Sequence, residues 1–389
     1  MTEPTQRLRQ LQSYLEADPA NPHLLYEVAD LQLQLRQPQA CQAALQQLFE
    51  LEPGHCPGRS LQGILLLQQN RLEEATAVFS QLRQDGWDEP ALHYNLAYAL
   101  MLQGRHAEAE APAATAAGRL DLLPEAGPLY ARNLHFLGKL TEAVAVAEQA
   151  LADHPEHLPL YGLLATLYLD QENLSGAEIV ARQVLAVAPQ DPDAATVLGM
   201  LALSQQDLAN AVPLLQAASR NKPNSGRAQV GLGLAAMLQG DLAEAEAAMV
   251  QALRNMPGHV GSWHVLAWSR ILQNKPQEAK EALLEALRLD RNFADTHGGL
   301  AIVSIMEGKL QEAQQSARRA LGLNPQSFPG QYAQSLLLQA AGLPGQAQAI
   351  HQQLMSTQVL PDGTSLQQAV ARAVALAPGR GQDGPPTLH

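Results

Sequence analysis

Small and large apolar residues recur along this chain with a period of 34 residues. Counting from Pro22, ten units follow one another through Pro361 without insertion or deletion. Position 20 of the unit is small in every copy: Cys41, Ala75, Ala109, Ala143, Ala177, Ala211, Ala245, Ala279, Ala313 and Ala347. Position 8 is also always small: Ala29, Gly63, Ala97, Ala131, Ala165, Gly199, Gly233, Ala267, Ala301 and Ser335. This regularity indicates one repeated packing geometry.

The spacing within each unit predicts two helices joined by a tight turn. We expect helix A over positions 1–14 and helix B over positions 18–30, with the small residues of positions 8 and 20 facing each other where the helices cross. A bulky residue at such a crossing would overpack it by about 1–3 kcal/mol. Position 7 is usually large and apolar, as in Val28, Leu96, Tyr130, Leu164, Leu198, Leu232, Leu266 and Leu300, with Gln62 and Gln334 as exceptions. Proline cannot continue a helix, and it follows helix B at position 32 in six units: Pro53, Pro155, Pro189, Pro223, Pro257 and Pro325.

This pattern resembles the tetratricopeptide repeat, in which W-x2-L-G-x2-Y, A-x3-F and P recur about every 34 residues. Trp263, Leu266 and Ala267 give the eighth unit the fullest match to the first half of that motif. The resemblance covers residues 5–377 and implies an all-α fold, a right-handed superhelical solenoid of helical hairpins. Because one hairpin cannot bury its apolar faces alone, such an array needs a cap at each end.

The same frame predicts the domain boundaries. We expect an N-terminal capping half-repeat over residues 1–21, with its helix from Thr5 to Ala17, and ten repeats over residues 22–361. A C-terminal capping helix is expected over residues 362–377, followed by a disordered, Gly/Pro-rich tail over residues 378–389. Pro112 and Pro213 fall inside helix B of the third and sixth units, where each is expected to kink or shorten the helix.

Composition and charge narrow the classes of partner. Hydrophobic residues make up 46% of the chain but aromatic residues only 4%, an excess of Ala and Leu that favours closely packed helices. The net charge of −13 argues against nucleic acid as a partner, because phosphate binding needs a basic surface. The acidic residues are concentrated in the first 200 residues, which either favours a basic segment of a partner there or serves solubility.

Motifs of catalysis are absent from the sequence. There is no HExxH, no GxxxxGK[ST] and no GxSxG, so we expect no catalytic residue, no cofactor and no metal site. Only two cysteines occur, Cys41 at a packing position and Cys56 at a unit boundary, which fits a reducing compartment. The N-terminus lacks the apolar core of a signal peptide, and no window is long and apolar enough to span a membrane. We therefore expect a cytoplasmic protein.

The resemblance also places the candidate binding residues. In this family helix A lines the concave surface, with positions 2, 5, 9, 12 and 13 pointing into it. In this chain the proposed groove residues are Tyr94, Tyr98, Met101, Arg132, His135, Phe136, Met200, Leu234, Met237, His264, Trp268, Ile271, Ile302, Met306 and Tyr332. The alternative is that these apolar positions pack against the next repeat. The Lys/Asn/Arg set with which chaperone-binding members hold a peptide carboxylate is missing.

An apolar, Met- and aromatic-rich groove suits an amphipathic helix or an extended apolar peptide. The sequence therefore predicts a non-catalytic scaffold, adaptor or chaperone that binds a segment of another protein. Two alternatives stay open. One is the recognition subunit of a multi-subunit enzyme or of a secretion or assembly complex. The other is a structural protein that forms homo-oligomers.

Overall fold

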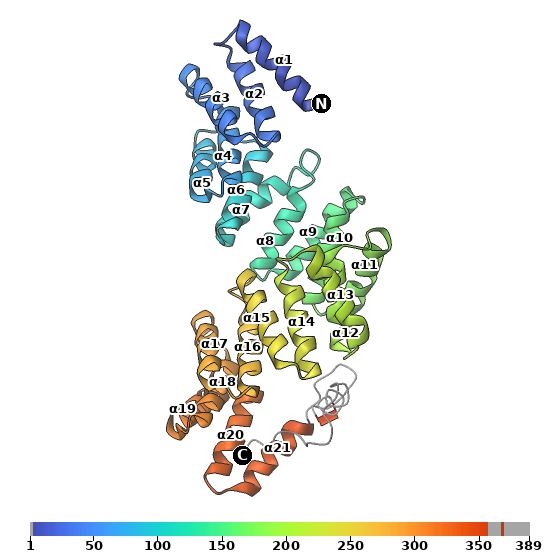
Figure 1. Ribbon diagram of the computed structural model, residues 1–389, viewed down its shortest axis with the longest axis vertical. Coiled ribbons are helices and arrows are strands. Elements are labelled where there is room, and N and C mark those ends of the chain that lie inside the picture. Colours follow the sequence, from blue (N-terminus) through green and yellow to red (C-terminus); the bar gives the residue numbers. More distant parts are fainter. Residues whose placement is uncertain (1–2, 357–366, 369–389) are drawn as a thin grey trace. The chain divides into compact units, whose positions relative to one another are not determined.

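The computed structural model describes residues 3–356 and 367–368, and no strand occurs within these residues (Figure 1). The chain divides into two compact units, residues 1–173 and 174–389. The expected C-terminal capping helix and tail, residues 362–389, lie outside the described residues except for Gln367 and Gln368, which are helical. The two units are described separately below.

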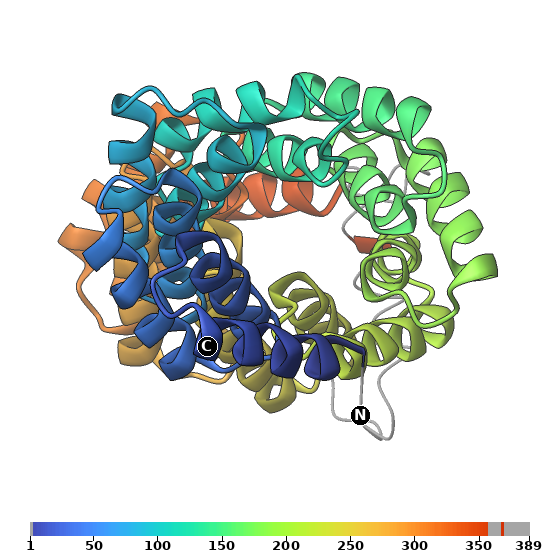
Figure 2. The same cartoon turned by 90° about the horizontal axis from the view of Figure 1, so that it is seen from above.

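The first unit contains an N-terminal helix followed by alternating A and B helices, which follow an arc when viewed from above (Figure 2). These helices are α1 (Glu3–Ala17), α2 (Pro22–Gln34), α3 (Pro38–Leu51), α4 (Cys56–Gln68), α5 (Leu72–Gln84), α6 (Pro90–Leu102), α7 (His106–Ala117), α8 (Ala126–Phe136), α9 (Leu140–Asp153) and α10 (Leu158–Asp170). The N-terminal helix starts two residues before the expected Thr5 and ends at the expected Ala17.

The second unit continues the same alternation. Its helices are α11 (Leu174–Val187), α12 (Pro192–Ser204), α13 (Leu208–Asn221), α14 (Gly226–Gln239), α15 (Leu242–Asn255), α16 (Val260–Leu272), α17 (Pro276–Leu289), α18 (Ala294–Met306), α19 (Leu310–Leu323), α20 (Phe328–Ala340) and α21 (Pro344–Ser356). Even-numbered helices are A helices and odd-numbered ones from α3 onward are B helices. Helix B begins at position 17, one residue before the expected start. The grouping of these helices into ten repeats with two caps stays a prediction.

The turn between helices A and B has one backbone conformation throughout the chain. Position 15 is left-handed in all ten units, whether it is glycine or not: Arg36, Asn70, Gly104, Gly138, Glu172, Gln206, Gly240, Asn274, Gly308 and Gly342. The N–H of position 16 donates to the carbonyl of position 11, as from Asp241 to Ala236 at 2.9 Å. This is the Schellman arrangement, which satisfies carbonyls at the end of helix A and reverses the chain.

The small residues of positions 8 and 20 are buried where the two helices cross, as predicted. Position 8 also receives the side chain of position 24. A Cβ added to Gly199 would lie 2.6 Å from Cγ of Leu215 and 3.4 Å from the carbonyl oxygen of Ala211 at position 20. The close contact of Leu215 therefore leaves no room for a side chain at Gly199. Other units place alanine opposite leucine at these two positions, as in Ala267 with Leu283.

The two internal prolines have different outcomes. Helix α7, which contains Pro112, has only 12 residues, and the next helix starts late, at Ala126. Pro213 lies inside α13, which keeps the full 14 residues of its neighbours. The predicted shortening is thus confirmed for Pro112 and does not occur at Pro213.

Candidate functional site

Three aromatic side chains from two A helices meet in the second unit, and we call them the Trp268 cluster: Trp268 on α16, and Phe328 and Tyr332 on α20. The rings of Phe328 and Tyr332 are parallel, with centroids 6.1 Å apart, and the centroids of Trp268 and Phe328 are 6.2 Å apart. Phe328 is 39% exposed, and the other two rings are half-buried. The cluster thus combines two half-buried rings with the accessible ring of Phe328.

A close backbone approach between α18 and α20 accompanies this cluster. A Cβ added to Gly298 would lie 2.5 Å from the backbone N of Gly330 and 2.7 Å from the carbonyl carbon of Pro329. No side chain larger than hydrogen fits at Gly298. The first turn of α20, which carries Phe328, is therefore held directly against α18, and from there Phe328 reaches Trp268 on α16. Position 1 was not among the predicted groove positions, so Phe328 was missed.

His264 is buried beside this cluster and does not line an open groove. Its Nε2 lies 2.8 Å from the Thr296 hydroxyl, and its ring meets the edge of Phe293 at a centroid distance of 5.0 Å. Burial lowers the pKa of His264, and the Asp295 carboxylate opposes that shift only in part. The imidazole is thus held neutral at pH 7 as a packing group that links α16 to α18.

Two other predicted groove residues of the second unit are core residues. Ile271 is 5% exposed and Ile302 is 3% exposed, and both belong to one hydrophobic cluster of α14–α20. Burial removes Ile271, Ile302 and His264 from the side chains that a partner can touch. Four more predicted groove residues are half-buried: Met200, Leu234, Met237 and Met306. Leu234 and Met306 pack against this cluster, and Met200 packs against a second hydrophobic cluster of the same unit.

In the first unit the predicted tyrosines form a stacked pair on α6. The rings of Tyr94 and Tyr98 are 6.3 Å apart and inclined by 11°, and Tyr98 is 40% exposed. Burial, with smaller contributions from Glu125 and Tyr98, raises the pKa of the Tyr94 hydroxyl, while Arg132 on α8 opposes the shift. Met101, three residues after Tyr98 on α6, is half-buried. Arg132 on α8 is exposed.

The end of α8 presents the remaining two predicted residues. His135 pairs with Asp170 of α10 at 2.7 Å, so its ring is engaged within the unit. Phe136 is 63% exposed and stacks on His106 at a centroid distance of 4.5 Å. His106 is oriented by the fully buried Asn133, whose Nδ2 donates to the His106 carbonyl at 3.0 Å. The exposed ring of Phe136 is thus positioned by its stacking on His106.

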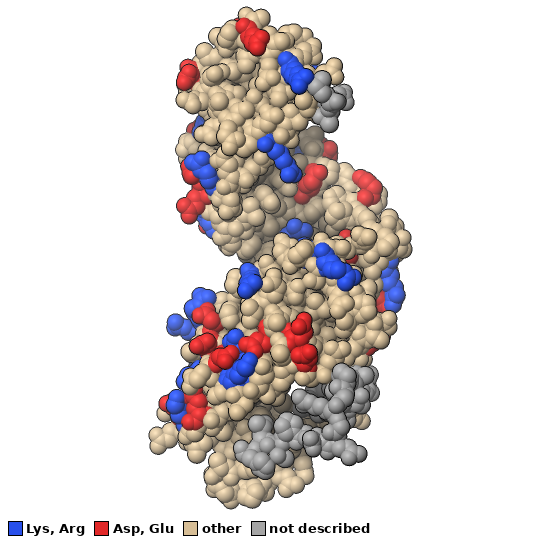
Figure 3. All heavy atoms as spheres, viewed as in Figure 1, with Lys and Arg blue, Asp and Glu red and all other residues tan. Residues whose placement is uncertain are grey.

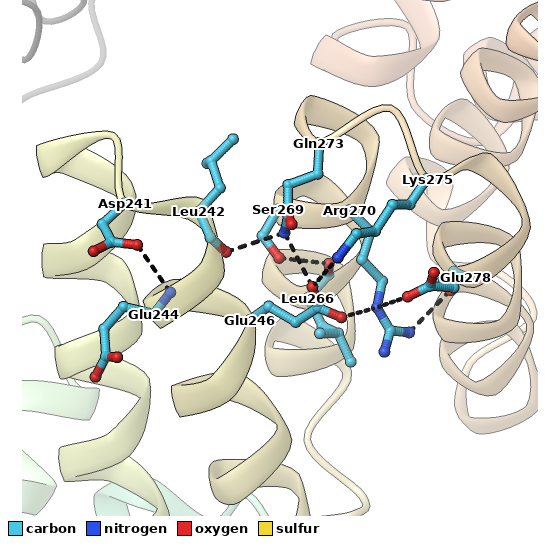
Figure 4. A network of polar contacts seen from close by, with 10 residues as sticks. All are labelled: Asp241, Leu242, Glu244, Glu246, Leu266, Ser269, Arg270, Gln273, Lys275 and Glu278. Atoms are coloured by element: carbon cyan, nitrogen blue, oxygen red, sulfur yellow. Dashed lines mark hydrogen bonds and ion pairs between the residues drawn. The ribbon is translucent and has the colours of Figure 1, made fainter. Parts of the chain in front are cut away.

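A charged network joins α15, α16 and α17 near their turns (Figure 4). Glu246 accepts hydrogen bonds from Arg270 at 2.8 Å and from Gln273 and Lys275 at 3.0 Å. Burial alone would raise the pKa of Glu246, but hydrogen bonds from Arg270, Lys275 and Gln273 lower it to about 2. The partners of Glu246 are all protein groups, so the network stabilises the contact between two hairpins.

The part of the chain that the structure describes offers little support for a metal site, a reactive thiol or a membrane span. Within it, no group of three or more His, Cys, Asp or Glu side chains could hold a metal ion. Burial raises the pKa of the Cys41 thiol to about 11, so this thiol is unreactive packing. Among the described helices, none combines the length and the apolar character that a membrane span requires.

Comparisons with known proteins agree with this architecture. Family models described as tetratricopeptide repeat match residues 60–124, 137–201, 196–259 and 264–328, which together are more than half of the chain. No curated protein matches the sequence. The structure is similar to human IFIT1, solved as a dimer with m7Gppp-AAAA, with 13% identity and a TM-score of 0.55, covering 86% of this chain and 89% of that one.

It is also similar to a chain of the APC/C hetero-tetramer Cut9-Hcn1, with 14% identity and a TM-score of 0.50, covering 88% of this chain and 81% of that one. At these identities the likeness shows the fold alone. The predicted fold class, an all-α right-handed superhelical solenoid of helical hairpins, is confirmed.

Proposed function

Because this chain belongs to the tetratricopeptide repeat family, we propose that it is a non-catalytic scaffold whose helix A aromatic side chains bind a segment of another protein. The observation that carries the proposal is the Trp268 cluster. Its three rings come from two A helices, and its exposed ring lies on a rigid backbone contact at Gly298. Aromatic side chains in such partly buried settings are the usual anchors of protein interfaces.

The apolar character of the Trp268 cluster favours an apolar side chain of the partner. Leu272, one turn beyond Trp268 on α16, is 53% exposed and extends the apolar surface. An amphipathic helix or an extended apolar segment could place one side chain against Phe328 and another against Leu272. In this proposal the scaffold acts as an adaptor or a chaperone for that segment.

Nucleic acid is a weaker candidate partner. The IFIT1 structure contains m7Gppp-AAAA, but that likeness concerns the fold. This chain carries a formal charge of −13, and phosphate binding draws on clustered Lys and Arg side chains. The Cut9-Hcn1 structure is an assembly of protein chains, and a protein segment agrees better with an apolar, aromatic surface.

The test is a comparison of capture by matched variants. The full chain is immobilised and exposed to extract of its native cells, and bound proteins are identified by mass spectrometry. Phe328→Ala and Trp268→Ala should lose a partner that the wild type captures. Ile179→Ala, which truncates a 55% exposed side chain on the B helix α11, should retain it. Circular dichroism checks that every variant keeps its helices. Equal capture by all three variants would refute the proposed site.

A further inference from the structure

Two open pockets lie on either side of helix α3 in the first unit. One, of about 580 Å³, lies between α1, α2 and α3, and Ala40, Ala43 and Ala44 form part of its wall. The other, of about 490 Å³, lies between α3, α4 and α5, with Leu45 and Phe49 in its wall. The residues that A helices contribute to these pockets, such as Gln32 and Gln62, lie at positions 11 and 7 of the repeat. These are not the groove positions 2, 5, 9, 12 and 13, so this surface is distinct from the one that carries the Trp268 cluster.

Primary amides dominate the polar lining of both pockets, and we call the surface around them the glutamine face. The first pocket is lined by Gln12, Gln32 and Gln47, and the second by Gln42, Gln46, Gln62 and Gln69. Within the second pocket, the only charged groups are Arg71 and Glu74, which neutralise each other through hydrogen bonds of 2.7 and 2.6 Å. Glu16 is the one charged residue of the first pocket.

This lack of charge contrasts with the rest of the molecule. Residues 1–173 contain 22 Asp and Glu against 10 Lys and Arg. The corresponding pocket of the second unit, between α15, α16 and α17, is lined by four charged residues: Arg254, Arg270, Glu281 and Glu285. Figure 3 shows charged side chains gathered over α15–α17, whereas the visible surface over α1 and α2 is mostly uncharged. The glutamine face is therefore a neutral surface on the more acidic unit.

Two of the amides occupy positions at which several other units carry leucine. Gln62 is at position 7, where Leu266 lines the corresponding pocket of the second unit. Gln32 is at position 11, where the next two units have Leu66 and Leu100. Leucine thus fits both positions in this fold, so packing alone does not call for an amide there.

The side-chain oxygen of Gln32 also lacks a hydrogen-bond partner within the described residues. Its side chain is only 6% exposed, and its Oε1 is buried without a hydrogen-bond donor. A buried acceptor left in that state costs about 1–3 kcal/mol. A ligand that brings an N–H group into the first pocket would remove part of this cost, given a small rotation of the amide.

We propose that the glutamine face is a second interaction surface, and that it binds an extended, uncharged protein segment carrying Gln or Asn side chains. A primary amide both donates and accepts, so it pairs reciprocally with another primary amide or with a peptide group. A carboxylate would lose its hydration in the first pocket, where Glu16 is the only charged residue, without gaining an opposite charge. Neighbouring helices are about 8–10 Å apart, so about three to four extended residues cross α3 from one pocket to the other.

The direct test is binding of a synthetic probe to the full chain. The probe is an acetylated and amidated 12-residue peptide of Gln, Ala, Asn and Leu with a fluorescent label, read by fluorescence anisotropy. A control peptide has Glu in place of every Gln. We expect saturable binding of the Gln peptide and at least tenfold weaker binding of the Glu peptide.

Two variants restore the leucine that other repeats carry, Gln62→Leu and Gln32→Leu. Each should weaken binding of the Gln peptide about tenfold, the equivalent of one lost hydrogen bond of about 1.4 kcal/mol. Gln32→Leu should also raise the melting temperature, because it removes an unsatisfied buried acceptor, and this readout shows that the variant is folded. Trp268→Ala should bind the peptide like the wild type, which separates this proposal from the function proposed above.

Three outcomes would overturn the proposal. The first is no saturable binding of the Gln peptide up to millimolar concentration. The second is equal binding of the Gln and Glu peptides, or binding unchanged by Gln62→Leu. The third is a concentration-dependent homodimer in light scattering that Gln62→Leu abolishes, because a second copy of this chain would then occupy the face.

Discussion

The phenyl ring of Phe79 on α5 lies directly against Gly63 on α4 and leaves no room there for a Cβ atom. The same relationship joins Met249 to Gly233 across the hairpin of α14 and α15. Where position 24 is alanine, as at Ala113, position 8 is alanine as well, at Ala97. The two positions thus share one volume, divided differently from unit to unit.

This relationship predicts the effect of Gly63→Ala. The fully buried Phe79 has nowhere to move, so the added methyl group overpacks the crossing by about 1–3 kcal/mol, less about 1 kcal/mol gained in helix propensity. We expect a net loss in the free energy of unfolding, measured with urea. Gly54→Ala is the control, because no atom lies within 4 Å of its added Cβ. The double variant Gly63→Ala, Phe79→Leu should recover part of the loss; no recovery would contradict the shared volume.

The left-handed residue at position 15 predicts a stabilising substitution. Gln206 has a φ of 57°, a conformation that costs a side-chain-bearing residue roughly 1–2 kcal/mol more than glycine. Gln206→Gly should therefore raise the unfolding free energy by about 0.5–1 kcal/mol, after allowing for the greater freedom of glycine in the unfolded chain. Gly240→Ala, at the same position of the next unit, should lower it by a similar amount. Thermal melts followed by circular dichroism would show both shifts, and equal melting temperatures would contradict the prediction.

The Glu246 network predicts a loss of stability in acid. The pKa of Glu246 is about 2 in the folded protein against an ordinary 4.5, so the unfolded chain takes up the proton first as the pH falls. The contribution of Glu246 is complete above about pH 4.5 and is lost as the pH falls toward 2. Glu246→Gln should cost about 1–2 kcal/mol at pH 7, and this difference from the wild type should vanish near pH 2. A difference that is independent of pH would exclude the network as its cause.

His264 predicts a second pH effect, at milder acidity. Because burial lowers its pKa in the folded state, the unfolded chain binds a proton more readily below the ordinary value of 6.5. The wild type should lose stability as the pH falls from 6.5 through the folded pKa. In the variant His264→Gln, the side-chain amide of glutamine can still reach Thr296, but it does not titrate in this pH range. Melting temperatures at pH 7.5 and 5.5 should therefore differ less in this variant than in the wild type.

Exposure divides the predicted groove residues into two classes with different stability effects. Ile302→Ala should cost about 2–5 kcal/mol, because it leaves a cavity in the core of the second unit. Phe136→Ala removes a 63% exposed ring and should change the unfolding free energy by about 0.5 kcal/mol or less. Urea unfolding of the two variants measures both values. Similar costs would mean that Phe136 is more deeply packed than its exposure indicates.

The sequence predicts the helices well because each repeat restates the same local rules. The small residues at positions 8 and 20 and the prolines at position 32 place most helix ends to within one residue. Helix B begins at position 17 where 18 was expected, and helix A usually ends at position 13 where 14 was expected. The sequence predicts a tight turn between helices A and B but not its left-handed residue. Glycine signals that conformation at Gly240, whereas Arg36 and Glu172 adopt a positive φ without such a signal. Local pattern predicts a turn, but not which non-glycine residue will tolerate strain.

The candidate sites were less predictable because they depend on contacts between repeats. Positions 9 and 12 of helix A were expected to line a groove, yet Ile302 at position 9 and Ile271 at position 12 are buried, whereas Tyr98 at position 9 is exposed. Phe328 reaches Trp268 only because Gly298 allows α18 and α20 to touch. The unsatisfied Oε1 of Gln32 cannot be predicted from the sequence, because its burial depends on neighbouring helices. A position within a repeat does not determine how neighbouring repeats cover it.

The contact at Gly298 has a mechanical consequence. Between most helices, interlocking side chains can rotate and let one helix slide slightly past the other. Between α18 and α20 the two main chains touch, with no side chain of Gly298 between them. Shear at this junction would force peptide groups into each other, so the last hairpins of the second unit should resist extension as a stiff block. A partner that pulls on Phe328 would then transmit its load to α18 without loosening the array.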